Sequence, residues 1–76
     1  MLNGHPGPAL VAWRSKNGVT QRELGIKIGV NDQMISNYEM GRNTPSLVTA
    51  FALERVTGID AELWALWEAQ LRGKAA

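Results

Sequence analysis

The sequence predicts a single all-α domain built from about five short helices. Its 76 residues suit one domain. Glycines and helix-capping residues divide the chain at short intervals, and no stretch alternates apolar and polar residues for long enough to indicate a strand. We therefore expect a flexible N-terminal lead-in at residues 1–8, a helical domain at 9–72 and a C-terminal tail at 73–76.

The first helix is expected over residues 9–17, ALVAWRSKN. The segment before it, NGHPGP at 3–8, has two prolines and two glycines among six residues, which favours a flexible lead-in. His5 lies in that segment, so we expect it to be exposed to solvent. Gly18 stands at the C′ position where a glycine commonly ends a helix.

The second helix is expected within residues 19–28, VTQRELGIKI. Thr20 and Glu23 have the spacing of a capping box, in which each side chain bonds the backbone amide of the other. Gly29 follows and ends the helix, because glycine adopts positive φ without steric cost.

The third helix is expected from Asn31, a suitable N-cap, to about Met40, with Gly41 closing it. Its apolar residues are few and are spaced to face inward. The side chains left pointing outward are short and polar: Asp32, Gln33, Ser36 and Asn37.

Two further helices complete the predicted domain. Ser46 caps a fourth helix, LVTAFALERVT, which ends at Gly58. Asp60 caps a fifth helix over residues 61–72, AELWALWEAQLR. In this last helix Leu63, Leu66 and Trp67 form one apolar stripe, and a second stripe comprises Trp64, Trp67 and Leu71.

The second and third helices together have the features of a helix-turn-helix. The turn between them needs a residue that tolerates positive φ, which Gly29 supplies. The first of the two needs a small residue where the other crosses it, which Gly25 supplies. The residues expected to pack between them are Leu24, Ile28, Val30, Ile35 and Tyr38. A helix with an outward polar face of this kind fits the DNA major groove.

The segment GVTQRELGIKIGVNDQMISNYEMGRNTPS resembles the phage-repressor type of helix-turn-helix domain, the Cro-like and Xre-like regulators. The resemblance covers roughly residues 9–64. The residues that carry it together are Thr20, Gln21, Glu23, Leu24, Gly29, Val30, Ile35, Ser36, Glu39, Gly41 and Pro45. It implies a compact five-helix bundle of the lambda-repressor-like type, in which helices 2 and 3 form the helix-turn-helix.

The resemblance also implies roles for individual residues. The base-reading face would be Asp32, Gln33, Ser36 and Asn37. The phosphate-binding set would be Gln21, Asn31, Arg42 and Asn43, with Gln21 also bracing the recognition helix. Arg14 and Glu39 match an internal ion pair between the first helix and the end of the third.

The chemistry of the outward face agrees with base reading, because amides and hydroxyls can both donate and accept. Gln33 or Asn37 has the geometry to bond an adenine edge. The alternative is a merely solvated helix face. Asp32 departs from the family pattern, since phosphates repel a carboxylate. It would either accept a hydrogen bond from cytosine N4, or cap the helix or steer the protein on the DNA without reading a base. Gly25 is a second departure, because the family more often has alanine there.

Composition gives only weak guidance. The net charge is +1, with five bases and three acids in residues 1–44 and three bases and four acids in 45–76. The front half is thus the better partner for a polyanion. There is no cysteine, which fits a cytoplasmic protein, and no apolar run approaches the roughly 20 residues that span a membrane. No catalytic or metal-binding constellation is visible, so we expect no enzyme activity, metal or cofactor.

These observations predict a sequence-specific regulator that binds double-stranded DNA, of the kind found as small phage or prophage repressors. Such a protein would bind a near-palindromic operator as a homodimer, since one short helix contacts few base pairs. The expected dimer interface is the apolar surplus of the fifth helix, Leu63, Trp64, Trp67 and Leu71; the alternative is that these residues only close the core. The rival function is the antitoxin of a toxin–antitoxin pair, with a toxin protein as partner.

Overall fold

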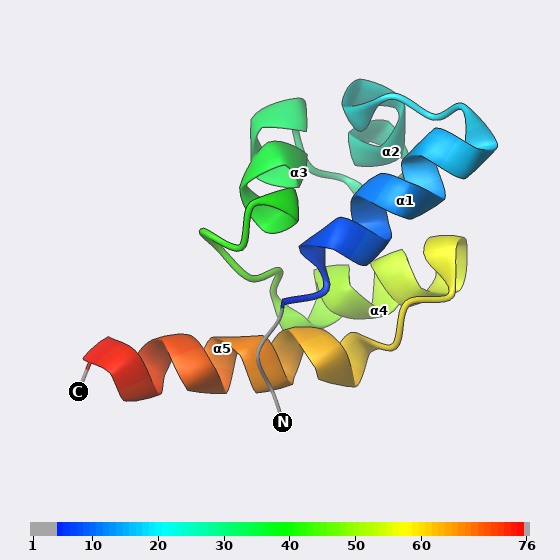
Figure 1. The fold of residues 1–76 in the computed structure, drawn as a ribbon. Coiled ribbons are helices and arrows are strands. Elements are labelled where there is room, and N and C mark those ends of the chain that lie inside the picture. Colours follow the sequence, from blue (N-terminus) through cyan, green and yellow to red (C-terminus); the bar gives the residue numbers. More distant parts are fainter. Residues whose placement is uncertain (1–4, 76) are drawn as a thin grey trace.

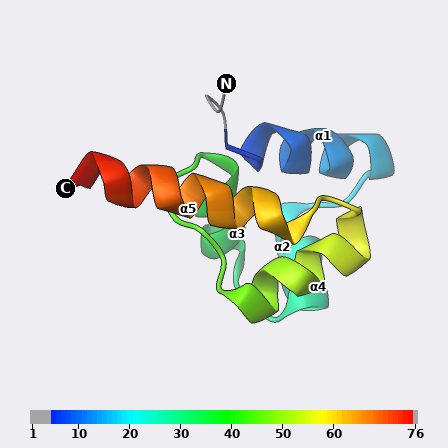
Figure 2. The ribbon, with the colours of Figure 1, turned by 90° about the horizontal axis from the view of Figure 1, so that it is seen from below.

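The computed structural model describes residues 5–75, and all regular structure within that range is helical (Figure 1). The helices are α1 (Gly7–Asn17), α2 (Gln21–Ile28), α3 (Asp32–Glu39), α4 (Leu47–Thr57) and α5 (Ala61–Ala75). This confirms the predicted all-α, five-helix fold. The pair α2 and α3 lies against α1 on one side of the molecule, while α5 runs along the opposite side and its C-terminal end projects past the other helices (Figure 1, Figure 2).

The predicted N-caps form in the structure. Thr20 and Glu23 make the full capping box, with the Glu23 amide 3.0 Å from Thr20 Oγ1 and the Thr20 amide 2.9 Å from Glu23 Oε1. The hydrogen bond from the Thr20 amide lowers the pKa of the Glu23 carboxyl. Asn31, Ser46 and Asp60 likewise accept from amides in the first turns of α3, α4 and α5. These bonds are local, which is why the sequence pattern locates them.

Two helix boundaries differ from the prediction. Helix α1 begins at Gly7 rather than at residue 9, because Pro6 is its N-cap and Pro8 lies in its first turn, where no amide hydrogen is needed. The predicted lead-in at 1–8 is therefore too long, and residues 1–4 lie outside the described residues. Helix α5 continues to Ala75 rather than ending at residue 72. Gly73 does not take the positive φ of a helix-ending glycine, so the predicted tail is largely helical.

The core lies where all five helices meet. Its buried apolar residues are Leu10, Leu24, Ile35, Tyr38, Ala50, Leu53, Ala61 and Trp64. Trp64 is only 1% exposed, and its ring packs against Tyr38 with centroids 6.0 Å apart. This corrects the prediction that Trp64 belongs to a dimer interface: the side chain is used inside its own domain. A small domain has few large residues with which to close its core.

The crossing of α2 and α3 is close. The Gly25 carbonyl accepts from the amides of Gly29 and Val30, at 2.8 and 2.9 Å. A Cβ atom on Gly25 would lie 2.4 Å from the Val30 carbonyl oxygen, nearer than real Cβ atoms approach. Gly29 has a φ of 83°, so the turn takes the left-handed conformation that the sequence predicts. In this chain glycine at position 25 is therefore a packing requirement, which explains its departure from the more usual alanine.

Within residues 5–75, no helix combines the length and the apolar character needed to cross a membrane.

Candidate nucleic-acid interface

The outer face of α3 carries the four side chains that the sequence assigns to base reading. Asp32 and Gln33 are exposed, and Ser36 and Asn37 are half-buried. The opposite face of the same helix carries Ile35 and Tyr38, at 0% and 2% exposure, and holds α3 on the core. The structure therefore gathers Asp32, Gln33, Ser36 and Asn37 on one accessible surface.

Gln33 and Asn37 lie one helical turn apart and touch. Gln33 Nε2 donates to Asn37 Oδ1 over 3.4 Å. Gln33 Oε1 and Asn37 Nδ2 make no hydrogen bond with the described residues, which leaves an acceptor on one side chain and a donor on the other. That combination is the complement of an adenine edge in the major groove, which offers the N6 amino group as donor and N7 as acceptor.

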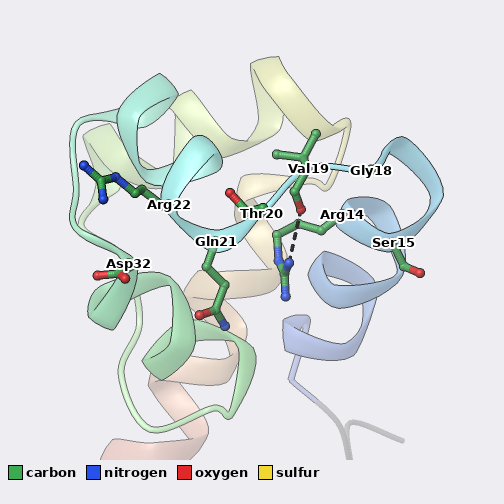
Figure 3. A pocket seen from close by; sticks show the side chains of 8 residues that line it. All are labelled: Arg14, Ser15, Gly18, Val19, Thr20, Gln21, Arg22 and Asp32. Carbon is green, nitrogen blue, oxygen red and sulfur yellow. Dashed lines mark hydrogen bonds between the residues drawn. The ribbon is translucent and has the colours of Figure 1, made fainter.

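A shallow depression of about 540 Å³ lies at the N-terminus of α2 (Figure 3). The C-terminal end of α1, the first turn of α2 and the start of α3 form its walls, and its lining residues are Arg14, Ser15, Gly18, Val19, Thr20, Gln21, Arg22 and Asp32. The first amides of a helix have no intrahelical partner and carry partial positive charge, so such a site suits an anion. Asp32 opposes this at one edge of the depression.

Arg22 is a lining residue that the sequence reasoning did not select. It is exposed, and its guanidinium points away from α2 at the edge of the depression (Figure 3). The sequence feature that could have identified it is a positively charged residue in the first turn of the second helix, immediately after Gln21. A cation there complements a bound phosphate in the same way as the helix amides do.

The Gln21 side chain makes a hydrogen bond within the protein. Its side chain points toward α3 (Figure 3), and Nε2 donates to Glu39 Oε1 over 2.9 Å. The bracing role therefore has a direct structural basis. Nε2 has a second hydrogen, so the same side chain can donate to a phosphate while it keeps this bond, and the backbone amide of Gln21 is a further donor for an anion.

Arg14 completes the connection between the first three helices. Its Nε and Nη2 donate to the two carboxylate oxygens of Glu39, at 2.5 and 3.0 Å, and Nη1 donates to the Val19 carbonyl at 3.1 Å. The side chains of Arg14 and Glu39 are 19% and 7% exposed. The hydrogen bonds to Glu39 raise the pKa of the Arg14 guanidinium.

The remaining phosphate candidates lie at the two ends of α3. Asn31 Oδ1 caps the helix by accepting from the Met34 amide at 2.8 Å, while the residue itself is exposed. Arg42 and Asn43 are exposed in the loop that follows α3. Their backbone amides both donate to the Asn37 carbonyl, at 3.0 and 3.5 Å, so the loop is attached to the C-terminal part of α3.

The apolar surface available for a partner differs from the predicted one. On α5, Leu63 is 44% exposed and Leu66 37%, while Trp67 and Leu71 are half-buried. The largest exposed apolar side chains on α4 were not selected from the sequence: Leu47 at 68%, Val48 at 79% and Phe51 at 53%. The sequence indicates this surface because the fourth helix has apolar residues on every side, and a single buried face cannot cover all of them.

Comparisons with known proteins agree with this geometry. A family model described as helix-turn-helix matches residues 10–64. The chain is 42% identical over 53 residues to a putative multi-protein-binding factor 1 of Yarrowia lipolytica, covering 70% of this chain and 35% of that protein. It thus spans about a third of that relative's length.

Two further relatives show the range of sizes. An uncharacterized HTH-type transcriptional regulator of Archaeoglobus fulgidus is 38% identical over 61 residues, which cover 68% of this chain and 87% of the regulator. Endothelial differentiation-related factor 1 of Homo sapiens is 34% identical over 53 residues, covering 70% of this chain and 36% of that protein.

Proposed function

The chain belongs to the helix-turn-helix family, and we propose that it is a sequence-specific transcriptional regulator that binds double-stranded DNA. The observation that carries this is the outer face of α3, where four short polar side chains stand accessible over a buried apolar face. Relatives of similar length are named HTH-type transcriptional regulators, which supports the same function.

In this proposal α3 enters the major groove with its first two turns at the base edges. Gln33 and Asn37 read an adenine through their free acceptor and donor. Ser36 lies on the same face and adds a hydroxyl that can donate or accept. Asp32 accepts from cytosine N4 or repels DNA that lacks a donor at that position, so it contributes discrimination rather than affinity.

Phosphates would be bound on either side of this contact. The depression at the start of α2 offers the Gln21 and Arg22 amides and the Arg22 guanidinium. The exposed side chains of Asn31, Arg42 and Asn43 offer further donors at the two ends of α3. Such contacts fix the register of the protein on the duplex without reading sequence.

The finer form of the proposal is a small repressor of the phage type that binds a near-palindromic operator as a dimer. One short recognition helix contacts too few base pairs to select a genomic site alone. A two-fold dimer would place two helices about one helical turn apart, roughly 34–36 Å. The exposed apolar residues of α4 and α5 support self-association, since such patches usually mark an interface.

Selection from a random duplex pool at fixed salt tests the base-reading assignment. We expect the wild-type protein to enrich one site. Gln33→Ala should cost about 1–3 kcal/mol on it and relax preference at one or two positions. Arg42→Ala should weaken all sequences alike and reduce the salt dependence of binding. An unchanged selected motif for Gln33→Ala would disprove its role.

Sedimentation tests the dimer. Phe51→Glu places a charge in the exposed α4 patch and should shift a dimer toward monomer, with little change in the free energy of unfolding. Val11→Glu is the matched control, because Val11 is also exposed, at 41%, but lies on α1. A wild-type monomer at high micromolar concentration that binds DNA one to one would rule the dimer out.

The second candidate function is an antitoxin, a protein-interaction module that also regulates by binding DNA. The exposed apolar face of α4 favours it, because a different protein could cover Leu47, Val48 and Phe51 equally well. A stable one-to-one complex with a purified toxin encoded beside this protein, weakened by Phe51→Glu, would support this function over homodimerisation.

A further inference from the structure

The peptide bond between Gly41 and Arg42 is held at both of its polar atoms. Its carbonyl, on Gly41, accepts from Trp67 Nε1 of α5 at 3.1 Å. Its amide, on Arg42, donates to the Asn37 carbonyl of α3 at 3.0 Å. The peptide unit that leads into Arg42 is therefore fixed between the recognition helix and α5.

The surroundings of Gly41 are closed as well. Gly41 is buried and has a φ of 74°, which favours glycine. The imidazole of His5 covers it, since a Cβ atom on Gly41 would lie 2.8 Å from His5 Cδ2. The His5 ring also packs on Trp67, with centroids 5.2 Å apart, and its Nδ1 accepts from the Gly7 amide at 3.0 Å. His5 is thus half-buried in a tertiary contact, contrary to the sequence expectation of a solvent-exposed residue.

A second connection joins the same loop to the next residue of α5. Thr44 Oγ1 donates to Glu68 Oε1 at 3.1 Å, and Glu68 Oε2 pairs with Arg72 Nη2 at 2.6 Å. Gly41 and Thr44 bracket Arg42 and Asn43, the two exposed candidates for phosphate contact. The loop between α3 and α4 accordingly lies beside α5 (Figure 1, Figure 2).

We propose that Trp67 and Glu68 are positioning residues for DNA binding, which act through the Gly41–Thr44 loop and orient Arg42 and Asn43 toward the DNA backbone. The inference rests on the proposed function and extends it to α5, a helix outside the helix-turn-helix. The physical basis is preorganisation: a loop that is already ordered loses less conformational entropy when it binds phosphate. Neither residue needs to touch DNA.

The test is a double-mutant cycle on DNA affinity, measured by fluorescence anisotropy on the selected duplex at a temperature where every variant is fully folded. Trp67→Phe keeps an aromatic ring but removes the donor to Gly41. We expect it to weaken binding about three- to tenfold, the range of one net hydrogen bond. The same substitution in an Arg42→Ala, Asn43→Ala background should have almost no effect, because the side chains that it orients are gone.

Substitutions of Glu68 test the second connection, because a conservative variant should restore binding. Glu68→Ala should weaken binding by a similar factor, whereas Glu68→Gln keeps an acceptor for Thr44 and should stay close to wild type. Trp13→Phe is the matched control, because Trp13 is a partly buried tryptophan of α1. A loss of fold stability alone would leave the affinity of folded protein unchanged, so affinity separates positioning from a purely structural role.

Two outcomes would overturn the inference while leaving the proposed function intact. One is a Trp67→Phe affinity equal to wild type when Arg42→Ala binds more weakly. The other is a Trp67→Phe loss of the same size with and without Arg42 and Asn43. Wild-type protein that binds no duplex would instead overturn the proposed function itself, and this role with it.

Discussion

Gln21 Nε2 donates to Glu39 Oε1 over 2.9 Å, and the same oxygen accepts from Arg14 Nη2 at 3.0 Å. One carboxylate at the end of α3 thereby joins α1 and α2 to α3. The side chain that the family resemblance assigns to a phosphate is used to hold α3 in place. In the proposed DNA complex, the angle at which α3 meets the duplex would therefore depend on the Glu39 carboxylate, which is only 7% exposed.

Loss of the Glu39 carboxylate should destabilise the domain. Glu39→Ala leaves the Arg14 guanidinium, 19% exposed in the wild-type protein, without its partner, and we expect a cost of about 3–5 kcal/mol in the free energy of unfolding. Urea denaturation measures it, with the exposed Glu62→Ala as control. Replacing both partners, as Arg14→Met with Glu39→Leu, should restore much of the loss. A single mutant with wild-type stability would contradict the importance of the pair.

Trp64→Ala should act on folding rather than on association. The side chain is 1% exposed in a single chain, so truncation opens a large cavity and should cost about 3–5 kcal/mol. Trp64→Phe should cost far less, because a ring remains beside Tyr38 and a buried indole Nε1 without a partner among the described residues is removed. Leu63→Ala, on the exposed side of α5, is the control for thermal melts. A folded Trp64→Ala that only loses self-association would favour the interface role instead.

Asp32→Asn should increase the affinity for random DNA and so reduce the specificity of binding. Asp32 is exposed at the start of α3 and lines the depression at the start of α2, where a phosphate would be repelled. Removing this charge should tighten binding to random duplexes, with little gain or a loss on the selected site. Titrations of both duplexes over a range of salt concentrations give the comparison. Equal tightening on the two duplexes would mean that Asp32 carries no sequence information.

Tyr38 should make the fold sensitive to alkali. Burial raises the pKa of its phenol above the ordinary value of about 10. Above the unfolded pKa the unfolded chain loses this proton while the folded chain keeps it, so stability declines as pH rises from there through the folded pKa. Tyr38 is the one tyrosine in the sequence, so phenolate absorbance reports it directly. The pH midpoint of the phenolate absorbance should be higher in the folded protein than in the urea-unfolded protein. Equal midpoints would refute the prediction.

The helices were predictable because their signals are local. Thr20 and Glu23, three residues apart, determine the start of α2 through bonds that do not depend on the rest of the chain. Gly18, Gly29 and Gly58 end helices for a similar reason, since each takes the positive φ that glycine permits. The outward face of α3 also follows from helical spacing alone, although what it binds stays a proposal.

Sequence alone thus determined the number and order of the helices, the N-caps of α2 to α5 and the polar outer face of α3. Only the tertiary structure decided that Trp64 closes the core, that Gly25 meets the Val30 carbonyl, and that Trp67 holds Gly41 from 26 residues away. Capping and helical periodicity act over one or two turns, so neighbouring residues specify them. Which apolar face is buried and which donor reaches a distant carbonyl depend instead on how five helices fill one small core, where each side chain's place depends on all the others.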